Sequence, residues 1–125
     1  MKKISPYVLT LSILIFSGCS FNSFIDFIVE NSSNNNITIS YYNHFERKTI
    51  VSSIAPRSTL TFYSVDTNEP NVDLSRFQTV PVDSFLIKNE LGLPYKEDES
   101  DLNPWTKFCE DDYGYFKLTV RDSDF

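Results

Sequence analysis

The chain has 125 residues, with eleven lysines and arginines against seventeen aspartates and glutamates and a formal net charge of −6. This length fits a single domain with one core. Because nucleic-acid binding needs lysine and arginine to neutralise phosphates, the acidic composition argues against a nucleic-acid partner, and equally against charge-driven binding to an anionic membrane.

The first twenty residues, MKKISPYVLTLSILIFSGCS, follow the order of a secretory signal peptide. Lys2 and Lys3 give a positive start, residues 8–16 are almost entirely apolar, and small residues precede Cys19. The apolar run is about half of the ~20 residues that a transmembrane helix needs, which favours a signal peptide over a membrane span.

The run Phe16-Ser17-Gly18-Cys19 resembles the lipobox of bacterial lipoproteins, although that family favours leucine where this chain has Phe16. In the family a diacylglycerol is attached to the cysteine thiol and a peptidase cuts before it. The resemblance implies a signal peptide over residues 1–18, lipidation at Cys19 and a short tether over residues 19–23. It further implies a cell-envelope protein held to the membrane by covalent lipid. In a host with two membranes it implies the outer one, since Ser20 rather than aspartate follows the cysteine.

Residues 24–125 are expected to form one β-rich domain. Four segments are rich in β-branched and aromatic residues and are separated by short polar turns, namely residues 24–30, 37–43, 49–54 and 59–65. This pattern predicts a mainly β fold, a small antiparallel β-sandwich or open barrel. Tyr41 and Tyr42 are neighbours on one strand, so one of them should be exposed.

The second half is less regular. Residues 83–92 can form a helix, with Asp83 as its cap and Gly92 at its end, but Phe85-Leu86-Ile87 suits a strand and we favour the strand. Asn103-Pro104 predicts one short helix near residues 104–110. Residues 115–121 alternate cleanly and predict a strand.

The residues that carry chemistry are few. Gly92 and Gly114 are too far apart to form a phosphate-binding loop, so no nucleotide cofactor is expected. With Cys19 lipidated, one histidine and one free cysteine fall short of the three or four ligands of a zinc site, and the acidic runs at residues 97–101 and 110–112 lack the pattern of a calcium loop. We therefore expect no metal site and interpret the acidic runs as a solvated face.

Cys109 has two interpretations. With Cys19 lipidated, it has no partner within the chain, and we favour a buried, inert side chain over a reactive thiol. If the lipobox interpretation is wrong, a Cys19–Cys109 disulfide is the alternative.

No catalytic motif is assembled in the sequence, so we favour a non-enzymatic, lipid-anchored module that binds a protein or glycan at the membrane surface. Tyr42 and Trp105 are candidates for its binding surface, although closure of the core is the favoured role of Trp105. The first alternative is a small envelope hydrolase that uses His44 or a carboxylate pair. The second is an acidic inhibitor or immunity-type protein, because the chain without residues 1–18 keeps nine basic against seventeen acidic residues, a net charge of −8.

Overall fold

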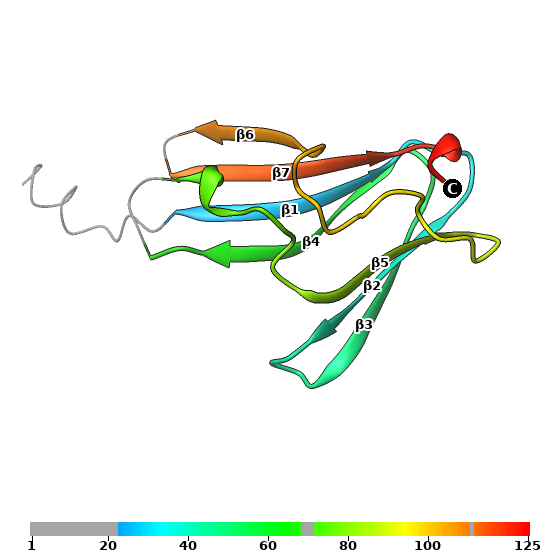
Figure 1. The fold of residues 1–125 in the computed structure, drawn as a ribbon, viewed down its shortest axis with the longest axis horizontal. Helices are drawn as coiled ribbons and strands as arrows, with labels where there is room; N and C mark the ends of the chain where they lie inside the picture. Colours follow the sequence, from blue (N-terminus) through cyan, green and yellow to red (C-terminus); the bar gives the residue numbers. More distant parts are fainter. Residues whose placement is uncertain (1–22, 69–71, 111) are drawn as a thin grey trace, which may run out of the picture.

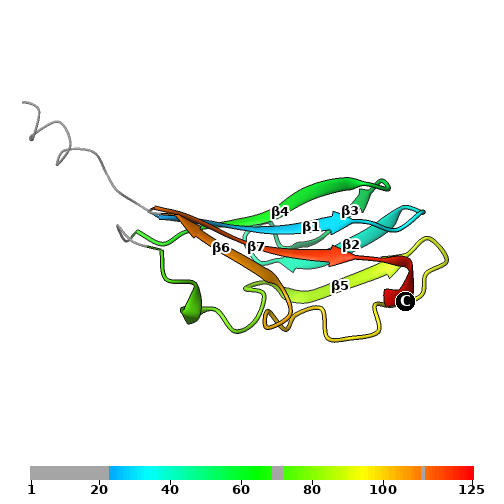
Figure 2. The ribbon, with the colours of Figure 1, turned by 90° about the horizontal axis from the view of Figure 1, so that it is seen from above.

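The computed structural model describes residues 23–68, 72–110 and 112–125, which form two β-sheets packed face to face (Figures 1 and 2). The elements in chain order are β1 (Phe24–Asn31), β2 (Ile37–Asn43), β3 (Lys48–Ile54), β4 (Ser58–Asp66), the 3-10 helix η1 (Leu74–Arg76), β5 (Asp83–Asn89), β6 (Thr106–Glu110), β7 (Tyr113–Val120) and the 3-10 helix η2 (Asp122–Asp124). The predicted mainly β fold, a small β-sandwich, is confirmed.

The first sheet has the strand order β4-β1-β7-β6 and the second has the order β3-β2-β5. Among these described strands every pairing is antiparallel except that of β1 with β7, which is parallel. A tight hairpin would force neighbouring strands to run in opposite directions. Since most of the chain separates β1 from β7, no hairpin constrains them, and the last strand lies parallel to the first.

The strand alternation seen in the sequence decides which side chains enter the core. On β1 the buried residues are Ile25, Phe27, Val29 and Asn31, and on β2 they alternate in the same way. Tyr41 is buried whereas Tyr42 keeps partial exposure, which confirms that the two tyrosines face opposite sides.

The helix predicted near residues 104–110 is wrong. Asn103-Pro104 lies in a turn, and Thr106–Glu110 forms the edge strand β6, paired with β7. So short a helix is marginal on its own, whereas the edge of β7 offers a ready hydrogen-bonded ladder. Residues 83–92 provide the favoured strand, β5, followed by a turn in which Gly92 has a φ of 80°.

The two sheets lie close together at the end that holds the C terminus and diverge towards the other end (Figure 1). Aliphatic side chains fill the narrow end, including Val29, Ile37, Ile54 and Val120. Aromatic rings fill the wide end, where Phe62 stacks on Phe85 with ring centroids 4.8 Å apart and both contact Trp105. The wide end is therefore held open by large rings, and the candidate site lies there.

Candidate functional site

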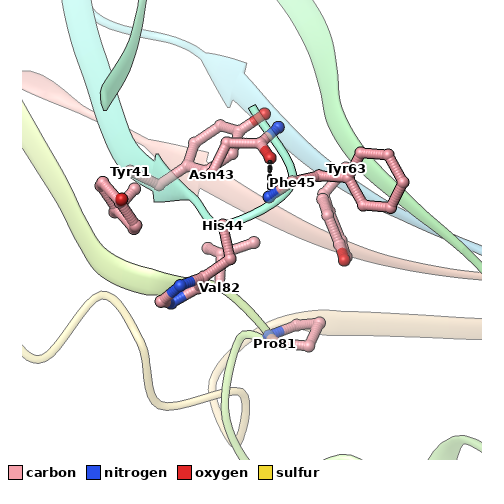
Figure 3. A pocket seen from close by; sticks show the side chains of 8 residues that line it. Tyr41, Asn43, His44, Phe45, Tyr63, Pro81 and Val82 are labelled. Atoms are coloured by element: carbon pink, nitrogen blue, oxygen red, sulfur yellow. Dashed lines mark hydrogen bonds between the residues drawn. The ribbon is translucent and has the colours of Figure 1, made fainter. Parts of the chain in front are cut away.

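A cleft of about 350 Å³ lies at the wide end of the sandwich, between the two sheets. Its lining comes from the end of β2, the β2–β3 turn, β4 and the segment before β5, namely Tyr41, Tyr42, Asn43, His44, Phe45, Tyr63, Pro81 and Val82. Figure 3 shows Tyr63 on one side of this cleft and Pro81 and Val82 beside His44. A cleft of this size, mainly aromatic with a few polar groups, is typical of small-ligand sites.

The β2–β3 turn is organised by one side chain. Asn43 Oδ1 accepts a hydrogen bond from the backbone N–H of Phe45 at 2.9 Å (Figure 3) and another from that of Glu46 at 3.0 Å. Arg47 adopts a left-handed conformation, with a φ of 57°, and reverses the chain into β3. Phe45 is left 98% exposed beside the cleft.

His44 is held by two neighbours. Its Nε2 contacts Oδ2 of Asp83, the first residue of β5, and its ring packs edge-on to Tyr42 with centroids 4.7 Å apart. The pairing of β2 with β5 brings these groups together, because Tyr42 lies opposite Asp83. A carboxylate in this position orients an imidazole and fixes its tautomer. None of the described residues that line the cleft is a serine, threonine or cysteine, so the pair has no neighbouring nucleophile there.

Tyr41 and Tyr63 form the wall from the core side. The Tyr41 hydroxyl donates to the carbonyl oxygen of Phe62 at 3.0 Å, and burial raises the pKa of this phenol. The Tyr41 and Tyr63 rings meet edge to face, 6.4 Å apart. The wall is therefore fixed by packing and does not depend on a ligand to order it.

The structure separates the two residues predicted for a binding surface. Tyr42 lines the cleft. Trp105 takes the role favoured for it, closure of the core, because it is only 3% exposed and packs against Phe62 and Phe85, so it is not part of a binding surface. Its indole Nε1 has no hydrogen-bond partner within the described residues.

The prediction that Cys109 is buried is also wrong. The residue lies on the edge strand β6 and is exposed, with its thiol 3.5 Å from the carbonyl oxygen of Val72. The cause is the replacement of the predicted helix by an edge strand. Cys19, the predicted lipidation site, lies outside the described residues.

Within the described residues, two carboxylates of the acidic run at residues 97–101 stabilise turns by accepting backbone hydrogen bonds. Asp98 accepts the backbone N–H of Ser100 and Asp101 accepts that of Asn103, each at 3.0 Å. No group of three or more histidines, cysteines, aspartates or glutamates is placed to hold a metal ion in residues 23–68, 72–110 and 112–125.

Sequence reasoning missed Tyr63, Val82 and Asp83 as parts of the site. They come from β4, from the segment before β5 and from β5 itself, and only the pairing and stacking of strands brings them to Tyr42. Tyr63 follows the core residue Phe62, and the register shift between β1 and β4 lies beside them. No local pattern marks such a shift.

Comparison of the chain with protein-family models, with curated protein sequences and with solved structures finds no match. Among the described residues, no helix is long and apolar enough to cross a membrane.

Proposed function

We propose that this protein is a lipid-anchored cell-envelope binding module and that the tyrosine-lined cleft takes a neutral saccharide of an envelope glycan. The anchor is inferred from the lipobox resemblance at Cys19. The observation that carries the binding role is the cleft itself, whose lining includes three tyrosines, from both sheets, together with His44.

The chemistry of the lining favours a neutral ligand. No lysine, arginine, aspartate or glutamate is among the described residues that line the cleft, and Asp83 is already engaged with His44. Flat rings suit the apolar faces of a sugar, while the phenol, amide and imidazole tips offer hydrogen bonds to its hydroxyls. A charged ligand would find no opposite charge to offset its desolvation.

The test is titration of the protein with a panel of neutral and N-acetylated oligosaccharides, followed by NMR chemical shifts. We expect the shifts to gather on the β2–β3 turn and on the strands that line the cleft. Tyr42→Ala and Tyr63→Ala should each weaken binding by about tenfold, since each removes an aromatic ring that lines the cleft. Tyr95→Ala is the matched control, because Tyr95 packs on Phe125, outside the cleft.

If no oligosaccharide shifts these resonances but an added peptide does, the ligand of the cleft is a protein partner and not a saccharide. Equal binding by wild type and both cleft variants would refute the site.

A second candidate, a hydrolase, is favoured by one observation, the contact between His44 and Asp83. In this case His44 would act as a general base towards water, because no side-chain nucleophile lines the cleft within the described residues. Release of reducing ends from the bound oligosaccharide, lost in His44→Ala, would establish it. If the oligosaccharide binds but is not cleaved, the hydrolase is excluded and the protein is a binding module.

A further inference from the structure

The outer face of the four-stranded sheet carries an aromatic patch, defined here as Phe24, Phe108, Tyr113 and Tyr115. The strand register places Phe24 beside Tyr113 and Phe108 beside Tyr115. The rings of Phe108 and Tyr115 stack with centroids 5.4 Å apart. Phe24, Phe108 and Tyr113 are 48%, 44% and 40% exposed, so the patch presents apolar surface to solvent.

The patch is confined to one end of the sheet. Further along the same face, Lys117 pairs with Glu30 at 3.7 Å and the hydroxyl of Thr119 donates to the same carboxylate. The core already occupies the inner face of this sheet, so burial against it does not account for the aromatic patch. Contiguous exposed apolar surface of this kind marks an interaction site.

The position of the patch matches the proposed lipid anchor. Phe24 is the first residue of β1 and follows Cys19 by five residues, a stretch that spans at most about 18 Å when fully extended. The patch lies at this same end of the molecule, where β1 and β7 begin (Figures 1 and 2). If Cys19 carries lipid, the aromatic patch is held within reach of the bilayer surface.

Aromatic side chains are favourable at the boundary between headgroups and acyl chains. We propose that the aromatic patch docks on the membrane that holds the anchor, at a zwitterionic surface with ammonium headgroups such as phosphatidylethanolamine. This inference rests on the proposed lipid anchor and goes beyond it, because it fixes the orientation of the domain on the membrane.

The charges around the patch select the lipid. Asp66 lies opposite Phe24 and Glu110 lies opposite Tyr113, and both are exposed. Within the patch, Asp26 is satisfied by hydrogen bonds from the Tyr113 hydroxyl at 2.7 Å and the Ser64 hydroxyl at 2.6 Å. The acidic rim repels anionic lipids and attracts ammonium headgroups, over a range of about 10 Å at 0.1 M salt.

The test places a tryptophan in the patch. The full chain is expressed, the processed protein is checked by intact mass for lipid on Cys19, and it is reconstituted into phosphatidylethanolamine–phosphatidylcholine vesicles with bromine high on the acyl chains. We expect Phe24→Trp and Phe108→Trp to shift to shorter emission wavelength and to lose about half of their added emission to bromine, as for a side chain in the interface. Replacing part of the lipid with phosphatidylglycerol should reduce this quenching.

Two matched controls bracket the result. Leu91→Trp places the reporter at an 84% exposed position in the turn after β5, at the opposite end of the molecule. In the wild-type protein the tryptophan emission comes from Trp105, which is buried in the core. Neither should be quenched by bromine.

The outcomes separate the two claims. Lipid on Cys19 with unquenched Phe24→Trp and Phe108→Trp overturns the docking and leaves the anchor in place. A wavelength shift without quenching means that a second copy of the protein covers the patch, which also overturns the docking. Absence of lipid from the wild type, with residues 1–18 still attached, overturns the anchor and the docking together.

Discussion

The side-chain amide of Asn31 donates a hydrogen bond of 2.8 Å to the carbonyl oxygen of Ile54, which joins the end of β1 in one sheet to the end of β3 in the other. The same amide donates to the carbonyl oxygen of Asn35 at 2.8 Å. Its Oδ1 accepts from the backbone N–H and the hydroxyl of Ser33, at 2.9 and 2.6 Å. Asn31 is fully buried, so one satisfied amide organises the β1–β2 turn and connects the sheets at their narrow end.

We expect Asn31→Leu to lower the free energy of unfolding by about 2–4 kcal/mol, because the Ile54 carbonyl and the Ser33 groups lose their partners while buried. Urea denaturation measures this loss. The control is Asn36→Ala at an exposed position of the same turn, which should change the free energy by less than about 0.5 kcal/mol. Equal effects of the two substitutions would contradict the role given to Asn31.

Gly114 permits the segment before η1 to pack on β7. A Cβ atom added there would lie 2.8 Å from Val72 Cγ1 and 3.0 Å from Leu74 Cδ2. We expect Gly114→Ala to cost about 1–3 kcal/mol through this overpacking. In a double-mutant cycle with Val72→Ala, the combined loss should be smaller than the sum, because the shortened side chain removes the closest clash. Strict additivity would show that the two residues do not meet.

Cys109 should react with a water-soluble maleimide in the native protein, because its thiol is exposed on an edge strand. The expected rate is within about threefold of that in urea, where every thiol is accessible. Mass spectrometry identifies the labelled residue, and Cys109→Ser removes the signal. Labelling that requires prior reduction would instead support a Cys19–Cys109 disulfide and count against lipidation.

Glu99 makes stability depend on pH. Desolvation by partial burial, with a smaller contribution from Asp98, raises the pKa of its carboxyl above the usual 4.5. The folded state therefore binds this proton more tightly than the unfolded state, and the associated stability is present below pH 4.5 and lost as pH rises through the folded-state pKa.

Glu99→Gln, which cannot ionise, should therefore raise the Tm at pH 7. The gain should shrink as pH falls through the raised folded-state pKa of Glu99 and vanish below 4.5, where the wild-type carboxyl is neutral in both states. Thermal unfolding between pH 3 and 7 measures the difference, with Glu97→Gln at an exposed neighbour as control. A gain that grows on acidification would mean that the carboxylate stabilises the fold.

The period-two alternation was enough to predict β2 and β7, because burial of one sheet face leaves a direct mark on the sequence, while β-branched and aromatic composition predicted β1. Alternation also separated Tyr41, which is buried, from Tyr42, which keeps partial exposure. It failed at residues 104–110, where Asn103-Pro104 has the local chemistry of a helix start. There the free edge of β7 pairs with Thr106–Glu110 and overrides local propensity.

The sequence by itself determined the mainly β class, the alternation of the strands, and the resemblance of its first residues to a lipoprotein signal. Tertiary structure alone decided that His44 meets Asp83, that Tyr63 faces the same cleft as Tyr42, and that Phe24 joins Tyr113 in a patch. The physical reason is that strand pairing and sheet packing join residues far apart in the chain. Their register depends on the summed burial of whole faces, which no single segment records.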